Sequence, residues 1–268
     1  MKNRIEKKFL DLKNSKEKAM ICFVSSGDPD LETSQEIINS LPKAGADIIE
    51  LGIPFSDPMA DGPTIQKSSI RAIKSGINLK KILSSVKVFR KNDKTTPVIL
   101  MGYFNPIFQF GLNSFFVSCS NVGVDGLIIV DLPPEEDDLI NKFTNKFNIH
   151  NIRLITPTTS KERIKKISSS SKGFLYYISI MGITGTKKPS MKEVKSSINK
   201  IKKITDLPIV VGFGINNSSQ VSEIYSFSDG CVVGSAIVNI IEKNLKKKTS
   251  IKKKINEFLL NLKKNANL

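Results

Sequence analysis

Eight short apolar runs, each followed by a stretch with helical periodicity, most constrain the fold of this chain. The runs are nearly continuous in Val, Ile, Leu and Phe, as expected for parallel strands buried on both faces. Eight strand–helix units in 268 residues predict an α/β fold, a closed (β/α)8 TIM barrel formed by residues 1–268 as a single domain. The runs span residues 19–29, 47–55, 97–106, 126–134, 152–159, 174–182, 208–215 and 230–237.

An extra N-terminal helix is predicted before the first run. Ile5, Phe9 and Leu12 are spaced at i, i+4 and i+7, so one apolar stripe could cover the bottom of the barrel. An open doubly wound sheet is the alternative architecture. No GxGxxG motif follows the first run, which disfavours a dinucleotide-binding version of that sheet.

The net charge of +16 raises the question of a nucleic-acid partner. Only five of the 41 basic residues are arginine, and no aromatic residues are interleaved with the lysines. We therefore interpret the lysines as residues of solvated helix faces, and we expect no nucleic-acid partner. No stretch approaches the length of a membrane span, and the first twenty residues lack the apolar core of a secretory signal. Cys22, Cys119 and Cys231 fit neither a disulfide framework nor a metal motif, so a cytoplasmic location is expected.

The carboxyl ends of the strands form the active face of such a barrel. The second run ends near Glu50, and the loop after it carries Asp57 and Asp61. The last two runs end in GFGI and GSAI, glycine-rich turns whose backbone N–H groups could hold a phosphate. The alternative is that these glycines only serve tight turns.

The residues that several catalytic mechanisms require are missing from this sequence. The one histidine, His150, is expected at the surface or the bottom edge, so no histidine metal cluster is predicted. No lysine lies in or at the end of a run, which argues against a Schiff base. Proton transfer by carboxylates remains, and burial of Glu50 should raise its pKa. Spacing alone leaves open that Glu50 pairs with a cation and that Asp61 only forms a turn.

The segment ELGIPFSDPMADGPTIQ at 50–66 resembles the signature of the tryptophan synthase alpha chain family. Similar segments recur as GDP at 27–29, GYFNP at 102–106, DGLIIVDLPPEE at 125–136, GITG at 182–185 and GSAIV at 234–238. The resemblance implies a lyase that cleaves indole-3-glycerol phosphate to indole and glyceraldehyde 3-phosphate in the last steps of tryptophan biosynthesis. It also implies no cofactor in this chain and a beta chain partner, carrying pyridoxal phosphate, in an alpha2beta2 heterotetramer.

The same resemblance implies roles for individual residues. Glu50 would be the general acid–base, and Asp61 would hold the indole N–H. The expected indole pocket consists of Phe23, Met101, Tyr176 and Phe213. The expected phosphate site consists of Gly185, Phe213, Gly214, Gly234 and Ser235. The expected contacts with the beta chain are Pro54, Phe55, Asp57 and Asn105.

Other functions stay open at this level. A catalytically weakened barrel that mainly activates the beta chain is the principal alternative. An isomerase or synthase of the tryptophan or histidine pathways would need a catalytic Lys, Cys or Asp at the first or eighth strand end, where only Cys22 is present, inside the run.

One departure from the family pattern gives a prediction. Ile180 stands where the family usually has an arginine, which removes a charge partner for the carboxylates of the second loop. We expect Ile180→Arg to increase the activation of indole release by the beta chain. An activation ratio unchanged from that of the parent chain would contradict this role.

Overall fold

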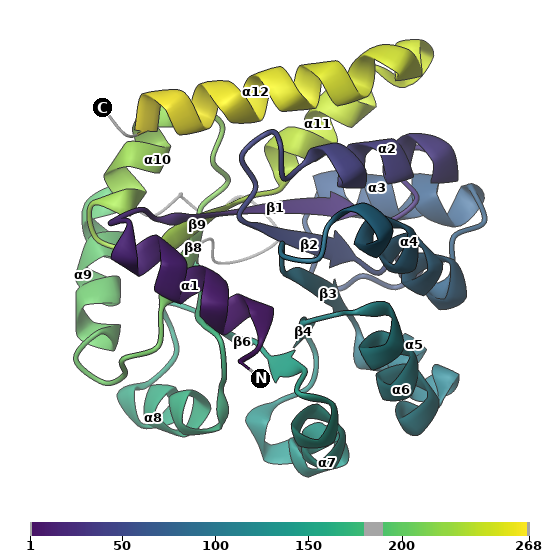
Figure 1. Cartoon of the computed structure of the whole chain (residues 1–268). Coiled ribbons are helices and arrows are strands. Elements are labelled where there is room, and N and C mark those ends of the chain that lie inside the picture. Colours follow the sequence, from purple (N-terminus) through teal and green to yellow (C-terminus); the bar gives the residue numbers. More distant parts are fainter. Residues whose placement is uncertain (1, 180–189, 267–268) are drawn as a thin grey trace.

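The computed structural model describes residues 2–179 and 190–266, which form a barrel of parallel strands surrounded by helices (Figure 1). The strands are β1 (Ala19–Ser25), β2 (Ile48–Gly52), β3 (Val98–Gly102), β4 (Gly126–Ile129), β5 (His150–Asn151), β6 (Arg153–Ile155), β7 (Leu175–Ile178), β8 (Ile209–Gly212) and β9 (Gly230–Val233). Each run identified in the sequence contains a strand. The fifth run contains β6, and β5 lies just before it.

The helices alternate with these strands along the chain. They are α1 (Arg4–Asn14), α2 (Leu31–Ser40), α3 (Pro63–Lys74), α4 (Leu79–Asn92), α5 (Phe104–Phe110), α6 (Leu112–Val122), η1 (Pro134–Glu136), α7 (Asp138–Phe147), α8 (Lys161–Ser170), α9 (Met191–Ile201), α10 (Ser218–Tyr225), α11 (Ser235–Lys243), η2 (Leu245–Ser250) and α12 (Ile251–Ala266).

The sheet closes on itself through the fifth strand. Hydrogen-bonded neighbours run in the order β5-β4-β3-β2-β1-β9-β8-β7-β6, and every pair is parallel. Only Ile152 separates β5 from β6, and its N–H donates to the carbonyl of Leu127 in β4 at 2.8 Å. The predicted TIM-barrel fold is therefore confirmed. The fifth strand of the barrel consists of two short segments, β5 and β6.

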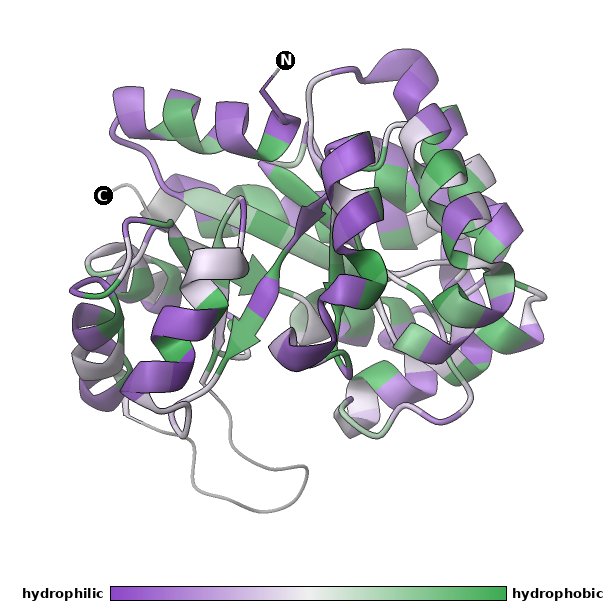
Figure 2. Cartoon of the chain, turned by 90° about the horizontal axis from the view of Figure 1, so that it is seen from below, coloured by the Kyte–Doolittle hydropathy of each residue, from purple (hydrophilic) through white to green (hydrophobic). Residues whose placement is uncertain are grey.

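Two apolar layers hold the barrel together. Alternate strand residues point outward and pack under the helices, while the others fill the interior with α1. In Figure 2 the strands are mostly green, while the helices around them mix green and purple residues. In β2, for example, Ile49 and Leu51 join the outer layer, whereas Ile48 joins the inner one. The same alternation turns Glu50 into the barrel.

The predicted N-terminal helix is confirmed and closes the bottom of the barrel. Ile5, Phe9 and Leu12 of α1 are buried in the inner layer. Asn3 caps this helix by accepting from the N–H of Ile5, and its amide donates to the carbonyl of Asp125 at 2.9 Å. His150 begins β5 at this end and is buried, so the expectation of a surface position was wrong while that of a bottom position holds.

Asp125 fastens the base of the barrel. Its carboxylate lies 2.7 Å from both Arg4 of α1 and Arg90 of α4, and it accepts from the N–H of Val98 in β3 at 2.8 Å. Asp125 and Arg90 are both buried. Removing one partner of such a pair leaves an uncompensated charge in a poorly solvated position.

We therefore expect Asp125→Ala to lower the free energy of unfolding by about 3–5 kcal/mol. Asp11→Ala removes the same charge from an exposed position of α1 and should change it by less than about 0.5 kcal/mol. Urea denaturation of both variants would measure the difference. Equal losses in the two variants would contradict the role assigned to Asp125.

Candidate active site

A cavity of about 210 Å³ opens at the carboxyl ends of the strands. This is the face on which barrel enzymes place their active sites. Its walls come from β1, β2, β3, β7, β8 and β9, from the loops after β2 and β8, and from the starts of α3 and α11. The lining residues are Phe23, Glu50, Ala60, Asp61, Gly62, Ile65, Met101, Tyr176, Ile178, Gly212, Gly214, Val232, Gly234 and Ser235.

Glu50 is a buried carboxyl group inside this cavity. It lies between Phe23 of β1 and Ile99 of β3 in the parallel register, and it is 1% exposed. Neither carboxyl oxygen has a hydrogen-bond partner among the described residues. Burial, and secondly the charge of Asp61, raise the pKa of Glu50 to about 8. The alternative of a structural ion pair therefore finds no support in the described part of the barrel, and Glu50 can hold a proton at neutral pH.

Asp61 reaches the same cavity from the loop between β2 and α3. Burial raises its pKa to about 6, although a hydrogen bond with Tyr103 acts in the opposite direction. The Tyr103 hydroxyl also accepts from the N–H of Ala60 at 2.9 Å, and its ring lies 5.1 Å from that of Phe55. Tyr103 thus holds both ends of this loop against β3, and Asp61 is placed to accept a hydrogen bond at neutral pH.

Tyr103 contacts the loop that carries Asp61 but was not among the predicted site residues. Its position directly after β3 in the GYFNP segment was the available signal, since strand ends carry the active-site residues of a barrel. Its contact with Asp61 depends on how the second loop folds back, which residue spacing does not reveal. Ile65, Ile178 and Val232 also line the cavity and were not among the expected residues.

The opposite side of the cavity suits an anion. Gly234 precedes α11, and no side chain caps the first N–H groups of that helix. Ser235 begins the helix, and Gly214, which has a positive φ of 68°, lies nearby on the cavity wall. Free N–H groups at a helix start favour a phosphate. Gly185 of the expected phosphate site lies outside the described residues.

Three residues of the expected indole pocket come together, and one does not. Phe23, Met101 and Tyr176 line the cavity. Phe213 instead packs in the outer apolar layer, because its neighbours Gly212 and Gly214 occupy the inward positions. The glycine at 212 is needed there, since a Cβ atom would lie 2.8 Å from the Tyr176 ring.

The expected partner-facing residues lie around the rim. Pro54 and Phe55 are half-buried in the second loop, and Asp57 is exposed beside them. Asn105 is exposed in α5, the helix that also presents Phe108. Met59 and Phe108, two large apolar side chains of this region, are 73% and 55% exposed.

None of the helices in residues 2–179 and 190–266 has the length and apolar character needed to cross a bilayer. Across the same ranges, no cluster of three or more His, Cys, Asp or Glu side chains is arranged to hold a metal ion.

The fold and the site define a class of protein, a (β/α)8-barrel enzyme that combines two carboxyl groups with an anion-binding helix start. Residues 9–267 match the family model described as tryptophan synthase alpha chain. The chain belongs to the tryptophan synthase alpha chain family. It is therefore a lyase that cleaves indole-3-glycerol phosphate in tryptophan biosynthesis. The alpha chain of this family needs no cofactor, and pyridoxal phosphate belongs to the beta subunit.

Individual relatives agree with this assignment. The tryptophan synthase alpha chain of Granulibacter bethesdensis is 47% identical over 243 residues, which cover 91% of this chain and 87% of that one. The crystal structure of the alpha subunit from Legionella pneumophila strain Paris has a TM-score of 0.93 at 37% identity and covers 100% of this chain and 99% of that one. A Mycobacterium tuberculosis tryptophan synthase structure has a TM-score of 0.89 at 27% identity, with 100% of both chains covered.

Proposed function

We propose that Glu50 and Asp61 carry out the cleavage as a pair with different protonation states. The neutral Glu50 carboxyl gives its proton to C3 of the indole ring, while ionised Asp61 accepts a hydrogen bond from the ring N–H. The negative charge of Asp61 stabilises the positive charge that the ring gains on protonation. The resulting Glu50 carboxylate then removes the proton of the glycerol hydroxyl next to the ring. The C–C bond breaks, its electron pair returns to the ring, and indole and an aldehyde result.

The observation that carries this proposal is the unpartnered, buried carboxyl of Glu50 facing the cavity that Asp61 also lines. The pKa values of about 8 and about 6 differ in the order that the mechanism requires. Between these values Glu50 keeps its proton while Asp61 is ionised. When the surroundings of two titratable groups separate their pKa values in this way, one group can act as the acid and the other as the base.

The rest of the cavity supports a defined orientation of the substrate. The uncapped start of α11, with Gly234 and Ser235, would hold the phosphate. Phe23 and Tyr176 would enclose the indole ring on the side of Glu50. We infer that Phe213 contributes its backbone rather than its ring, because the side chain packs outward.

We also infer that the chain acts as a single domain, in the cytoplasm, in an alpha2beta2 complex with a beta chain. The exposed Met59 and Phe108, on the same rim as Asp57 and Asn105, support a protein partner there. Three buried free thiols fit a reducing compartment. Related structures from Mycobacterium tuberculosis are structures of tryptophan synthase as a whole.

Indole release from indole-3-glycerol phosphate tests this function against the activator alternative. The purified chain would be assayed alone and with its cognate beta chain. We expect slow release alone and faster release in the complex. Release in neither sample, together with normal stimulation of the beta reaction, would instead establish an activator without lyase activity.

A further inference from the structure

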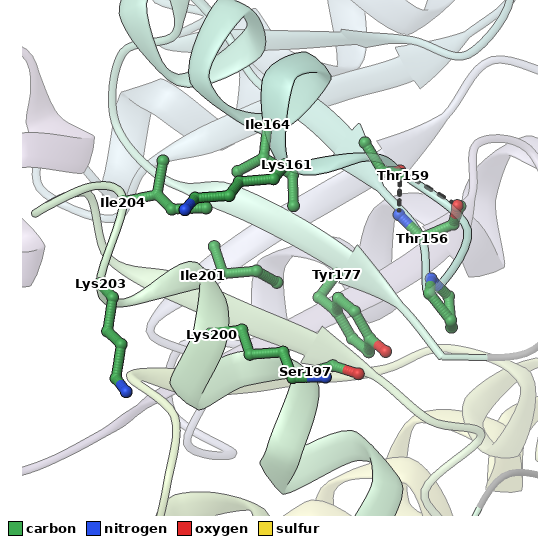
Figure 3. Close-up of a pocket in the computed structure, with 11 residues that line it drawn as sticks. Thr156, Thr159, Lys161, Ile164, Tyr177, Ser197, Lys200, Ile201, Lys203 and Ile204 are labelled. Atoms are coloured by element: carbon green, nitrogen blue, oxygen red, sulfur yellow. Dashed lines mark hydrogen bonds between the residues drawn. The ribbon is translucent and has the colours of Figure 1, made fainter.

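A second cavity, of about 410 Å³, lies outside the barrel, where α8, β7 and α9 meet (Figure 3). It shares no lining residue with the cavity that holds Glu50. In Figure 3 the Tyr177 and Ser197 side chains lie at one end, and Ile204 and Lys161 lie toward the other. The volume is in the range of natural small-molecule sites.

Three lysines line this cavity without a carboxylate among the lining residues. The side-chain ammonium groups of Lys161, Lys200 and Lys203 make no hydrogen bond or salt bridge with the described residues. Lys161 does interact electrostatically with its exposed neighbour Glu162. Neighbouring lysines behave differently. Lys166 pairs with Glu135 at 2.9 Å, and Lys202 pairs with Asp229 at 3.3 Å. The cavity is therefore bordered by three lysines whose ammonium groups have no salt bridge in the described part of the chain.

The inner wall of the cavity is apolar. Ile164 and Ile201 are buried on the α8 and α9 sides, and the ring of Tyr177 lies between the two helices. The Tyr177 hydroxyl is hydrogen-bonded with Ser197, and burial raises its pKa. A ligand that fits here needs an apolar body against this wall and an anionic group near the lysines.

From these features we propose that the cavity between α8 and α9 binds a small organic anion with an apolar, aromatic-sized body. This site goes beyond the lyase function and does not depend on it. It lies directly behind the active site, because Tyr176 and Tyr177 are consecutive residues of β7 that face opposite sides of the sheet. Lys200 supplies the principal charge, since its side chain runs toward Ser197 and the Tyr177 ring (Figure 3).

A matched pair of probes tests this proposal. Backbone amide NMR shifts of the full chain would be followed during titration with 1-naphthoate and with neutral 1-naphthalenemethanol. We expect 1-naphthoate to shift the amides of Tyr177, Ser197 and Lys200. The neutral alcohol should bind roughly fivefold or more weakly, because it lacks the charge that the lysines recognise.

Two variants of the same helix locate the site. Lys200→Glu is expected to weaken 1-naphthoate binding about five- to tenfold, because it reverses a charge at the cavity. Lys195→Glu makes the same change at an exposed α9 position that does not line the cavity, and should alter binding by less than about twofold. Lys200→Gln, which only removes the charge, should give an intermediate loss.

Three results would overturn the proposal. Shifts confined to other parts of the chain, such as Gly234 or Phe108, would place the anion elsewhere. Equal affinity for the acid and the alcohol would remove the role of charge. Equal effects of Lys195→Glu and Lys200→Glu would show only a general response to the net charge of the protein.

Discussion

Glutamine in place of Glu50 is expected to lower the rate of indole release by about a hundred- to ten-thousandfold. The amide has nearly the shape of the carboxyl group but cannot deliver a proton to the indole ring. Because the Glu50 carboxyl group makes no hydrogen bond to the described residues, this change breaks no side-chain hydrogen bond there. The measurement is the single-turnover rate of indole formation by the isolated chain at pH 7.

The same substitution should stabilise the protein at alkaline pH. The pKa of Glu50 is raised from 4.5 to about 8 on folding, so the folded state binds more protons than the unfolded state between these values. The free energy of unfolding of the parent chain therefore falls as pH rises through this window. Each pKa unit corresponds to about 1.4 kcal/mol. The free energy of unfolding of Glu50→Gln minus that of the parent chain should therefore be several kcal/mol larger at pH 9 than at pH 5.

A matched control separates these effects from the loss of a surface charge. Glu32→Gln changes an exposed glutamate of α2. Its rate of indole release, and the change in its free energy of unfolding between pH 5 and pH 9, should both equal those of the parent chain. A Glu50→Gln protein that releases indole at the parent rate would contradict the acid–base role. An inactive variant that is also unfolded would be recognised in the denaturation experiment.

Asparagine in place of Asp61 is expected to lower the rate by about a hundred- to a thousandfold, because the ring N–H loses its anionic partner. The parent chain should show a bell-shaped pH profile for kcat/KM, with limbs near the pKa values of about 6 for Asp61 and about 8 for Glu50. In Asp61→Asn the acid limb should disappear. The basic limb should move to lower pH, because the charge of Asp61 helps to raise the pKa of Glu50.

General damage to the site would lower the rate without moving the basic limb to lower pH. Asp138→Asn, at an exposed position of α7, removes the same charge outside the cavity and should leave both limbs in place. A basic limb that stays at the parent pH in Asp61→Asn would show that Asp61 does not act on Glu50.

The barrel could be predicted because its strands are buried on both faces and therefore appear as continuous apolar runs. The division of the fifth strand at Ile152 left no such signal. His150 illustrates why one polar residue is hard to place: its burial depends on α1 and β5 meeting at the base of the barrel, which no local pattern records.

The candidate site was predictable to the extent that it follows strand ends. Glu50 could be selected because it interrupts an apolar run, and Asp61 because it lies in the loop that follows. Phe213 shows the limit of that reasoning, since a shift of one position in a strand turns a side chain from the cavity to the outer layer. Tyr103 shows another limit, because its hydrogen bond with Asp61 joins two different loops.

The most direct measurement of the central claim is a ¹³C NMR titration of the Glu50 side-chain carboxyl in the isolated chain, with Glu50→Gln used to assign its signal. We expect a midpoint near pH 8, with the carboxyl neutral at pH 7. A midpoint near the ordinary value of 4.5 would mean that Glu50 is ionised at neutral pH and cannot be the acid that protonates the indole ring.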